Sequence, residues 1–368
     1  MKINKRHPSP RWTGIDLFRG FAIFGVIILH ADEGIPTHSS SWAKILEFSG
    51  FAVPFFLATS FYLAFQKIYQ TGREFQIKPR LIRLLLPYLV WTGIYVSYKA
   101  LKYLLQNESD NLNQLFHDPI ALIFFGGAAF QLYFLPLLLS GTLLIKPISG
   151  LTTQQTRISD LIALCLLSLV GYQIILTSGN YFDNASGLAF QSLFNIPFLG
   201  ELEDHQFLRI LLVEIAFMIR CLPYLFIAAL ITHPKINLSF QNQTILYLMT
   251  TLALFLMINL FGGQLLPISL YELSRGYTAL LLALALSHYL PQHPMIKNLS
   301  VCSFGIYLIH LLFVDSFQII ENRLDAEAIF RMSTPNLLMF AILVLAISWV
   351  ATDFLMKKKF LARLMFGI

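Results

Sequence analysis

The first long apolar segment of the chain carries two side chains that could do chemistry, Arg19 and His30. A separation of eleven residues is close to three helical turns, so both side chains point to the same side, roughly 16 Å apart along the axis. A guanidinium binds anions, and an imidazole with an unperturbed pKa of about 6.5 can act as a general base. The structural alternative is that Arg19 reaches the lipid headgroups and His30 ends the helix. Asp16, three residues before Arg19, is expected to pair with it.

A basic cluster, Lys78, Arg80 and Arg83, precedes another long apolar run. Arg80 and Arg83 are three residues apart at the start of the expected helix, so they project from one face. Because arginine matches phosphate oxygens with two parallel hydrogen bonds, this spacing is typical of an anion site. The same cluster would also serve as an ordinary positive anchor at the membrane surface.

Near the other end of the chain, Ser303, Tyr307 and His310 are spaced four and three residues apart. This spacing places the three side chains on one face of a helix. A histidine in the middle of a membrane helix needs a hydrogen-bonding partner, which Tyr307 or Ser303 could supply. The alternative is a histidine that only completes the packing of the core.

Further ionisable residues lie within apolar segments, where charges are costly and usually functional. Glu272 and Arg275, three residues apart, are expected to pair with each other. Arg220 requires a partner from another helix. The candidates are Asp315 and the neighbours of Glu214.

The composition shows what kind of protein positions these groups. Of 368 residues, 56% are hydrophobic and only 12% are charged, whereas soluble proteins carry about 25% charged residues. This excludes a soluble enzyme, a disordered chain and a coiled coil. Continuous apolar runs also disfavour a transmembrane β-barrel, whose strands alternate. The prediction is an all-α, polytopic membrane helical bundle. The three cysteines lie apart in apolar segments and are interpreted as buried hydrophobic residues, so no metal site is expected.

Apolar runs long enough to cross a bilayer predict about ten transmembrane helices. Glycines 126 and 127 are expected to split the fourth into a short re-entrant piece and a span that starts near Phe130. The ten predicted spans cover approximately residues 14–31, 45–66, 82–104, 122–145, 158–177, 208–232, 244–262, 266–290, 299–320 and 336–356.

The loop charges orient these spans. With the N-terminus inside, cytoplasmic segments hold most of the 26 lysines and arginines, and the acidic residues gather in the outer loops. The positive-inside rule therefore places both termini in the cytoplasm, and it accounts for the net charge of +6 without nucleic acid. We expect one membrane domain over residues 1–368 with no soluble appendage. The outer loop Ser178–Gln206 is a candidate lid or acceptor-binding surface.

Five segments, in this order, resemble the acyltransferase 3 family of bacterial multi-pass membrane acyltransferases. The family patterns are Asp-x-x-Arg-Gly with a later histidine, Phe-Phe-x-x-Ser-Gly-Phe, Arg-x-x-Arg with a following proline, His-Leu-Trp-Phe-Leu, and Ser-x-x-x-Tyr-Leu-x-His. Each motif is weak alone, but together they span about residues 11–355. Thr59-Ser60 replaces Ser-Gly, and Gln131 and Tyr133 replace His and Trp. The matching segments are Asp16–Gly20 with His30, Val53–Phe61, Pro79–Tyr88, Gln131–Leu135 and Ser303–His310.

The resemblance implies an O-acyltransferase of the cell (inner or plasma) membrane. Such enzymes move an acyl group, usually acetyl, from cytoplasmic acyl-CoA to a hydroxyl of a carbohydrate or glycolipid outside, such as lipopolysaccharide or another polysaccharide. In this chain Arg80, Arg83 and Lys78 would hold the phosphates of the acetyl-CoA donor, and Arg19 would extend that site. His30 would be the general base. The face formed by Tyr307, His310 and Ser303 would polarise the thioester carbonyl or orient His30.

A proton-coupled secondary transporter or flippase is the alternative, since about ten spans with buried charges suit transport. Many transporters show internal repeats, and the Arg19/His30 pattern has no second copy in the sequence. This favours the acyltransferase. Direct transfer to the acceptor and a transient acyl-histidine are both compatible with these residues.

Overall fold

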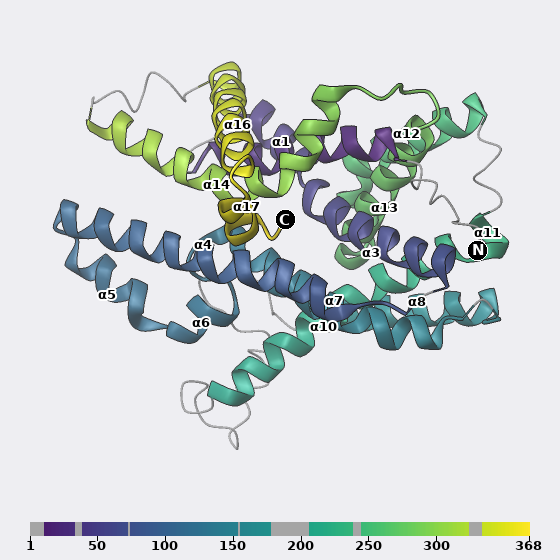
Figure 1. Ribbon diagram of the computed structural model, residues 1–368. Coiled ribbons are helices and arrows are strands. Elements are labelled where there is room, and N and C mark those ends of the chain that lie inside the picture. The colour runs from purple at the N-terminus through teal and green to yellow at the C-terminus, as the bar shows by residue number, and fades with distance from the viewer. Residues whose placement is uncertain are drawn as a thin grey trace, which may run out of the picture.

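The computed structural model describes residues 11–33, 39–72, 74–153, 155–177, 206–237, 244–323 and 333–368. Within these residues every regular element is a helix, which confirms the predicted all-α polytopic bundle (Figure 1). The elements are α1 (Thr13–Ala31), α2 (Ser40–Ser49), α3 (Ala52–Thr71), α4 (Ile77–Gln106), α5 (Ser109–His117), α6 (Pro119–Phe124), the 3-10 helix η1 (Phe130–Tyr133), α7 (Phe134–Leu151), α8 (Ile158–Thr177), α10 (Gln206–Thr232), α11 (Pro234–Asn237), α12 (Ile245–Leu265), α13 (Ile268–Leu286), α14 (Pro294–Arg323), α16 (Thr334–Met356) and α17 (Lys359–Phe366).

Nine spans among the described residues are long and apolar enough to cross a membrane. They correspond to nine of the ten predicted spans. The tenth, α13, does not reach the same hydropathy, because it carries Glu272, Arg275 and several hydroxyl side chains. It nevertheless packs inside the bundle against α1, α3, α8 and α12. The predicted outer loop at 178–206 lies outside the described residues except for its last position.

The break predicted in the fourth span is confirmed. The short helix α6 ends at Phe124, and α7 begins only at Phe134, after the turn of η1. Gly126 has a φ of +79°, which favours glycine. A Cβ there would lie 2.4 Å from the backbone nitrogen of Tyr133. The backbone nitrogen of Gly126 donates to the hydroxyl of Tyr88 at 3.0 Å, so α4 holds the break in place.

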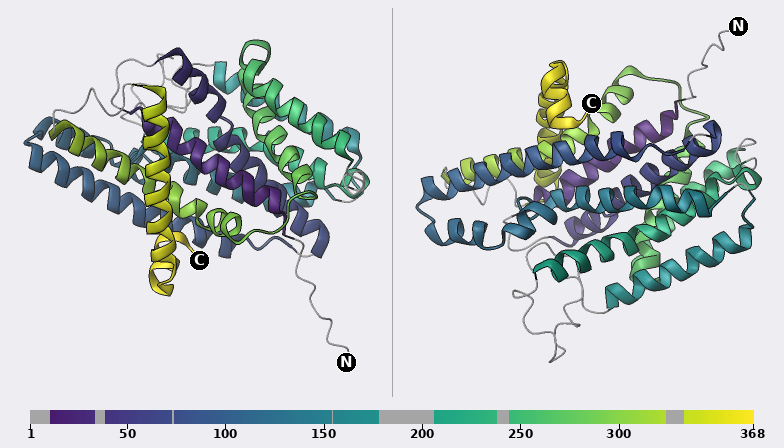
Figure 2. Two further views of the ribbon diagram at one scale, coloured as in Figure 1. Left: turned by 90° about the horizontal axis from the view of Figure 1, so that it is seen from above. Right: turned by 60° about the horizontal axis from the view of Figure 1, so that its bottom comes forward.

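Helix α1 lies in the interior of the bundle. It packs against α3, α13, α14 and α16. In its 18-residue apolar stretch 72% is buried inside the protein, compared with 22% for the corresponding stretch of α12. Figure 2 (left) shows α1 running between these helices. Chemical groups on α1 therefore face protein on most sides, whereas helices such as α12 present most of their surface outward, to lipid.

The C-terminal helices return the chain to α4. Helix α16 crosses the direction of α4 steeply in each view (Figures 1 and 2), and α17 packs on α4. The indole nitrogen of Trp91 donates to the carbonyl of Met365 at 2.9 Å, and Nε of Arg83 donates to the carbonyl of Gly367 at 3.0 Å. These contacts close one side of the cavity that holds the candidate site.

The pairing expected between Glu272 and Arg275 is wrong. Glu272 instead accepts two hydrogen bonds from Arg220, at 2.9 and 3.2 Å, so the partners suggested for Arg220 near Glu214 or Asp315 are also wrong. Arg275 donates to Oδ1 of Asn259 at 3.0 Å and lies over the ring of Tyr271. The reason is geometric: Glu272 and Arg275 lie on one helix, but their side chains turn toward different neighbouring helices, α10 and α12.

Candidate active site

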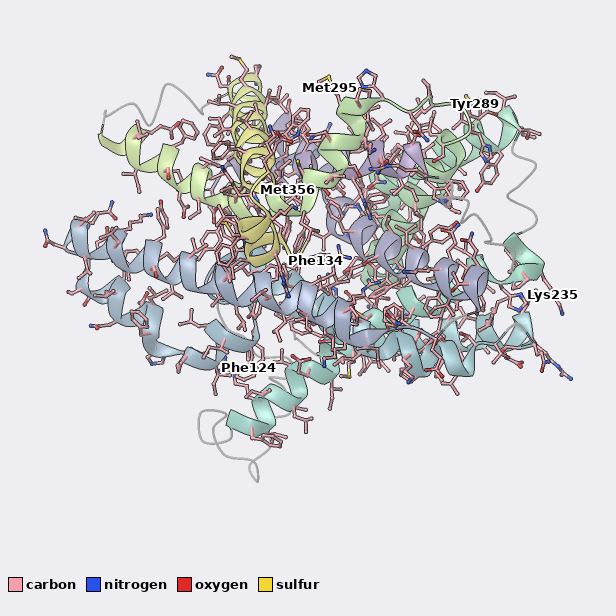
Figure 3. The ribbon with its side chains drawn as sticks, in the orientation of Figure 1. Phe124, Phe134, Lys235, Tyr289, Met295 and Met356 are labelled. Carbon is pink, nitrogen blue, oxygen red and sulfur yellow. The ribbon has the colours of Figure 1, made fainter. Side chains whose placement is uncertain are left out.

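A cavity of about 480 Å³ lies between α1, α3, α4, α7 and α14, and residues of the C-terminal helices bound one side of it. Its wall combines three guanidinium groups, from Arg19, Arg80 and Arg83, with apolar side chains. Phe134 of α7 and Met356 of α16, both labelled in Figure 3, belong to the apolar part. The cavity therefore offers concentrated positive charge beside a hydrophobic surface.

The two arginines of α4 enter the cavity because this helix begins at Ile77, just before them. Arg80 donates to the hydroxyl of Ser60 on α3 at 2.6 Å, which ties the first turn of α4 to α3. Arg83 is more exposed and donates to the carbonyl of Gly367. Lys78, from the same cluster, is exposed and is not part of the cavity wall. The structure thus brings Arg80 and Arg83 together with Arg19, and leaves Lys78 outside.

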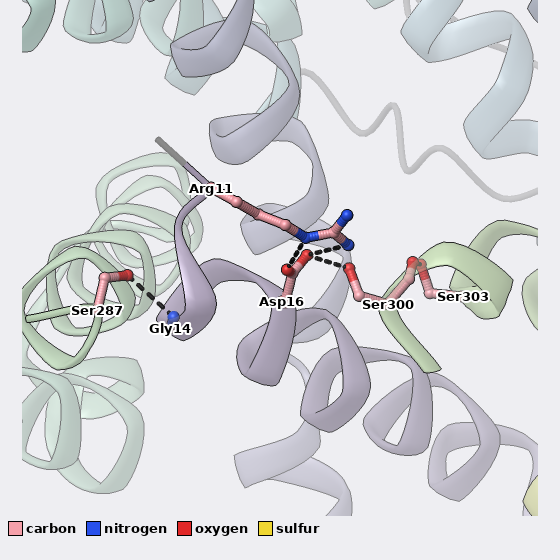
Figure 4. Close-up of polar contacts among 6 residues, drawn as sticks. All are labelled: Arg11, Gly14, Asp16, Ser287, Ser300 and Ser303. Carbon is pink, nitrogen blue, oxygen red and sulfur yellow. Dashed lines mark hydrogen bonds and ion pairs between the residues drawn. The ribbon is translucent and has the colours of Figure 1, made fainter. Parts of the chain in front are cut away.

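Asp16 does not pair with Arg19, contrary to expectation. Its carboxylate accepts hydrogen bonds from Arg11 and from the hydroxyl of Ser300 at 2.6 Å (Figure 4). Nearby, the backbone nitrogen of Gly14 donates to the hydroxyl of Ser287 at 2.9 Å. Asp16 therefore fastens the start of α1 to α14, and the guanidinium of Arg19 faces the cavity.

Tyr307 of α14 belongs to the cavity wall, and the centroid of its ring lies 6.2 Å from that of His310. Its hydroxyl donates to the backbone carbonyl of Gln131, and its ring packs against Phe134. Ser303 also lines the cavity, and its hydroxyl donates to the carbonyl of Ser300 at 2.8 Å. Both hydroxyl hydrogens are therefore occupied within the protein.

His310 lies one helical turn beyond Tyr307 and is fully buried. Its partner is neither of the two predicted side chains: Nδ1 lies 2.8 Å from the backbone carbonyl of Tyr307. Because a carbonyl can only accept, Nδ1 carries the hydrogen and Nε2 has a free lone pair. Nε2 is buried and has no hydrogen-bonding partner among the described residues. The imidazole ring of His310 is thus fixed in orientation, and its Nε2 is available to accept a hydrogen bond.

His30 of α1 lies beside His310, with ring centroids 5.4 Å apart. Its ring also contacts Phe130 of η1 edge to face, and its Nδ1 is 3.8 Å from Oε2 of Glu33. Glu33 follows the end of α1, and burial together with the negative charge of Asp315 raises the pKa of its carboxyl. Helices far apart in the sequence therefore bring two imidazoles into contact.

The site has one component that the motifs did not indicate as reactive, the side chain of Gln131. It is only 2% exposed, and neither of its amide atoms makes a hydrogen bond with a described residue. The sequence marked Gln131 only as a departure from a family pattern. Whether a buried amide finds a hydrogen-bonding partner depends on how the helices pack, and no local sequence pattern predicts it.

The groups run in one direction through the protein, from the arginine cavity past Tyr307 and His310 to His30 and Glu33. Among the described residues no cluster of three or more His, Cys, Asp or Glu could hold a metal ion. Such an array can bind an anionic molecule at one end and move a proton at the other.

Comparison with known proteins identifies the family of the chain. No curated protein and no solved structure matches the chain. A family model described as an acyltransferase domain matches residues 12–353. This range includes the arginines of the cavity, both histidines, Gln131 and Tyr307, but not the C-terminal residues of the cavity wall. The chain therefore belongs to the acyltransferase 3 family and is a multi-pass membrane acyltransferase.

Proposed function

We propose that this acyltransferase moves an acetyl group from acetyl-CoA, bound in the arginine cavity, to a hydroxyl of a carbohydrate or glycolipid on the opposite side of the membrane. The observation that carries the proposal is the continuity between the two ends. Three guanidinium groups line one cavity, and Tyr307 in its wall leads directly to the paired imidazoles of His310 and His30.

The donor suits the cavity in its charge and in its apolar lining. Arg80, Arg83 and Arg19 would bind the phosphates, and arginine holds phosphate oxygens with charge-assisted hydrogen bonds. The apolar wall would receive the pantetheine arm. A volume of about 480 Å³ lies within the range of roughly 300–1,000 Å³ that is typical of small-molecule sites. Lys78, exposed at the start of α4, would act only by attracting the anion at longer range.

The chemistry requires a general base for the acceptor hydroxyl and a proton donor for the leaving thiolate. The hydroxyl of the acceptor transfers its proton to His30 as its oxygen bonds to the acyl carbon. The carbon–sulfur bond then breaks, and the thiolate of CoA takes up that proton. His310, held by the carbonyl of Tyr307, would orient His30 or relay its proton. The Tyr307 hydroxyl, bonded to the carbonyl of Gln131, positions η1 against α14.

The sidedness follows from the loop charges, which predict both termini in the cytoplasm. The arginine cavity then opens toward the cytoplasm, where CoA esters occur. His30, about three turns further along α1, lies toward the outer surface, where polysaccharide or lipopolysaccharide hydroxyls are accessible. The membrane would be the inner or plasma membrane.

The donor is tested by measuring CoA binding and acetyl-CoA turnover with the purified protein in detergent. Arg80→Ala with Arg83→Ala should weaken CoA binding strongly. Lys67→Ala is the matched control, because Lys67 is exposed on neighbouring α3 and is not in the cavity wall. If the double variant and the control bind CoA equally well, the cavity does not hold the donor.

The transporter or flippase alternative rests on buried charges. Two of these, Arg220 and Glu272, are hydrogen-bonded to each other and line no part of the arginine cavity. This counts against a transport role. Uptake of a carbohydrate into proteoliposomes without any acetyl-CoA consumption would favour the alternative.

A further inference from the structure

Gln131 is the described residue that leaves two buried side-chain polar atoms without partners, Oε1 and Nε2. Resting on the proposed function, we infer that the Gln131 amide binds the carbonyl oxygen of the acyl group during transfer and stabilises the negative charge that develops there. Gln131 would thus be a catalytic residue in addition to the histidines.

The backbone of Gln131 is held between the two halves of the site. Its carbonyl accepts a hydrogen bond from Tyr307, which lines the arginine cavity. The preceding residue, Phe130, packs against the ring of His30. Gln131 therefore sits where a thioester that extends from the cavity would meet a hydroxyl activated by His30.

The neighbouring protein groups leave the amide incomplete. The hydroxyl of Tyr95 lies beside the Gln131 side chain, but its hydrogen is donated to the carbonyl of Leu308 at 2.8 Å. Tyr95 can therefore accept from one hydrogen of the NH₂ group at most, and it supplies no donor to Oε1. Leaving a buried amide unpaired costs folding free energy, because its hydrogen bonds to water are lost without replacement. A substrate that supplies the missing partner would offset this cost, and the position of Gln131 between the cavity and His30 distinguishes it from the other unpaired groups.

The site also needs a hydrogen donor for the carbonyl. The hydroxyls of Tyr307 and Ser303 already donate to backbone carbonyls, and the free Nε2 of His310 is an acceptor. The NH₂ group of Gln131 can donate twice, and glutamine is among the side chains that form oxyanion holes. In the transfer step, Gln131 would donate to the acyl oxygen while the new oxygen–carbon bond forms and the carbon–sulfur bond breaks.

The test replaces Gln131 by Met, which has a similar shape and no donor. Removal of one oxyanion donor should lower kcat by about 10²–10³-fold, with unchanged affinity for CoA, because the arginines still bind it. The unfolding midpoint without ligand should stay at or above that of the parent, since an unpaired polar group has been removed. Gln131→His, which keeps a ring donor, should retain more activity than Gln131→Met.

The matched control is Thr352→Val, which removes another buried, unpaired polar atom that does not belong to the cavity wall. It should preserve both kcat and stability. Parent-like turnover by Gln131→Met would overturn the inference and point to a bound water as the partner of the amide. Equal losses of kcat and stability in both Gln131 variants would also overturn it, by assigning a structural role. A parent that neither binds CoA nor consumes acetyl-CoA would instead refute the proposed function on which the inference rests.

Discussion

Buried polar groups gather in two regions of this protein and are treated differently in each. In the first, α8, α10 and α13 meet at Arg220 and Glu272, whose hydrogen bonds are joined by those of the Tyr172 and Tyr224 hydroxyls at 2.6 and 3.1 Å. In the second, around α1, η1 and α14, Nε2 of His310 and the whole amide of Gln131 have no partner among the described residues.

On the proposed function, the groups of the first region hold the fold and those of the second bind the substrate. A buried ion pair with additional hydrogen bonds is complete, and its loss is felt by the packing of three helices. An incomplete network is costly to keep and becomes satisfied only when substrate binds. We therefore expect changes in the Arg220–Glu272 region to reduce stability first, and changes in the His30–His310–Gln131 region to reduce rate first.

The largest effect should come from His30→Ala. Removal of a positioned general base lowers the rate by about 10²–10⁴-fold, whereas folding and CoA binding should be nearly unchanged. Single-turnover acetyl transfer by the purified variant measures the first quantity, and thermal unfolding and CoA titration measure the others. Near-normal transfer by His30→Ala, combined with an inactive His310→Ala, would move the base to α14.

The next largest effect is expected on stability, in the Arg220–Glu272 region. Glu272→Leu alone should lower the free energy of unfolding by about 3–5 kcal/mol, because it leaves the guanidinium of Arg220 buried without its counter-charge. The double variant Arg220→Met, Glu272→Leu should be less destabilised than this single variant. Unfolding in detergent measures both. A stable Glu272→Leu that has lost acetyl transfer would contradict the structural role and place this region in the chemistry.

A smaller effect is expected at the donor cavity. Arg80→Ala should weaken CoA binding by about 1.5–3 kcal/mol, the typical value of one charge-assisted hydrogen bond. Arg83→Lys should lose less than Arg83→Ala, since a point charge replaces only part of a fork. Isothermal titration with CoA compares the variants. Parent-like titration curves for all three would mean that the cluster is only a membrane anchor.

The smallest effect concerns a paired carboxylate outside the spans. Burial disfavours the charged form of Asp118, yet hydrogen bonds from Arg209 and from the backbone nitrogen of Ala121 hold its pKa below the usual range. The contribution to stability is therefore present above pH of about 3.9, the unfolded value, and is lost as the pH falls through the lower folded value.

For this partly exposed pair we expect Asp118→Asn to cost only about 0.2–1 kcal/mol at neutral pH, with no change in kcat. The difference in unfolding midpoint between Asp118→Asn and the parent should shrink in acid. A reduced rate of acetyl transfer would instead connect this pair to the acceptor side of the site.

The sequence alone determined the features that depend on residues close together in the chain. Apolar runs predicted the spans, because a bilayer demands about 20 apolar residues in a row. The Gly126 break and the common face of Arg80 and Arg83 also follow from local backbone geometry. Motif order correctly predicted the family.

Only the tertiary structure decided which polar groups meet. Helical spacing suggested that Arg275 pairs with Glu272 and that Arg19 pairs with Asp16, but spacing says only which contacts are possible. Packing selects among them: Asp16 pairs with the exposed Arg11 and Glu272 with the buried Arg220, because the assembled helices bring these side chains within reach of each other. The contact of His30 with His310, and the unpaired amide of Gln131, arise from the packing of α1 and η1 on α14, for which no single segment carries a signal.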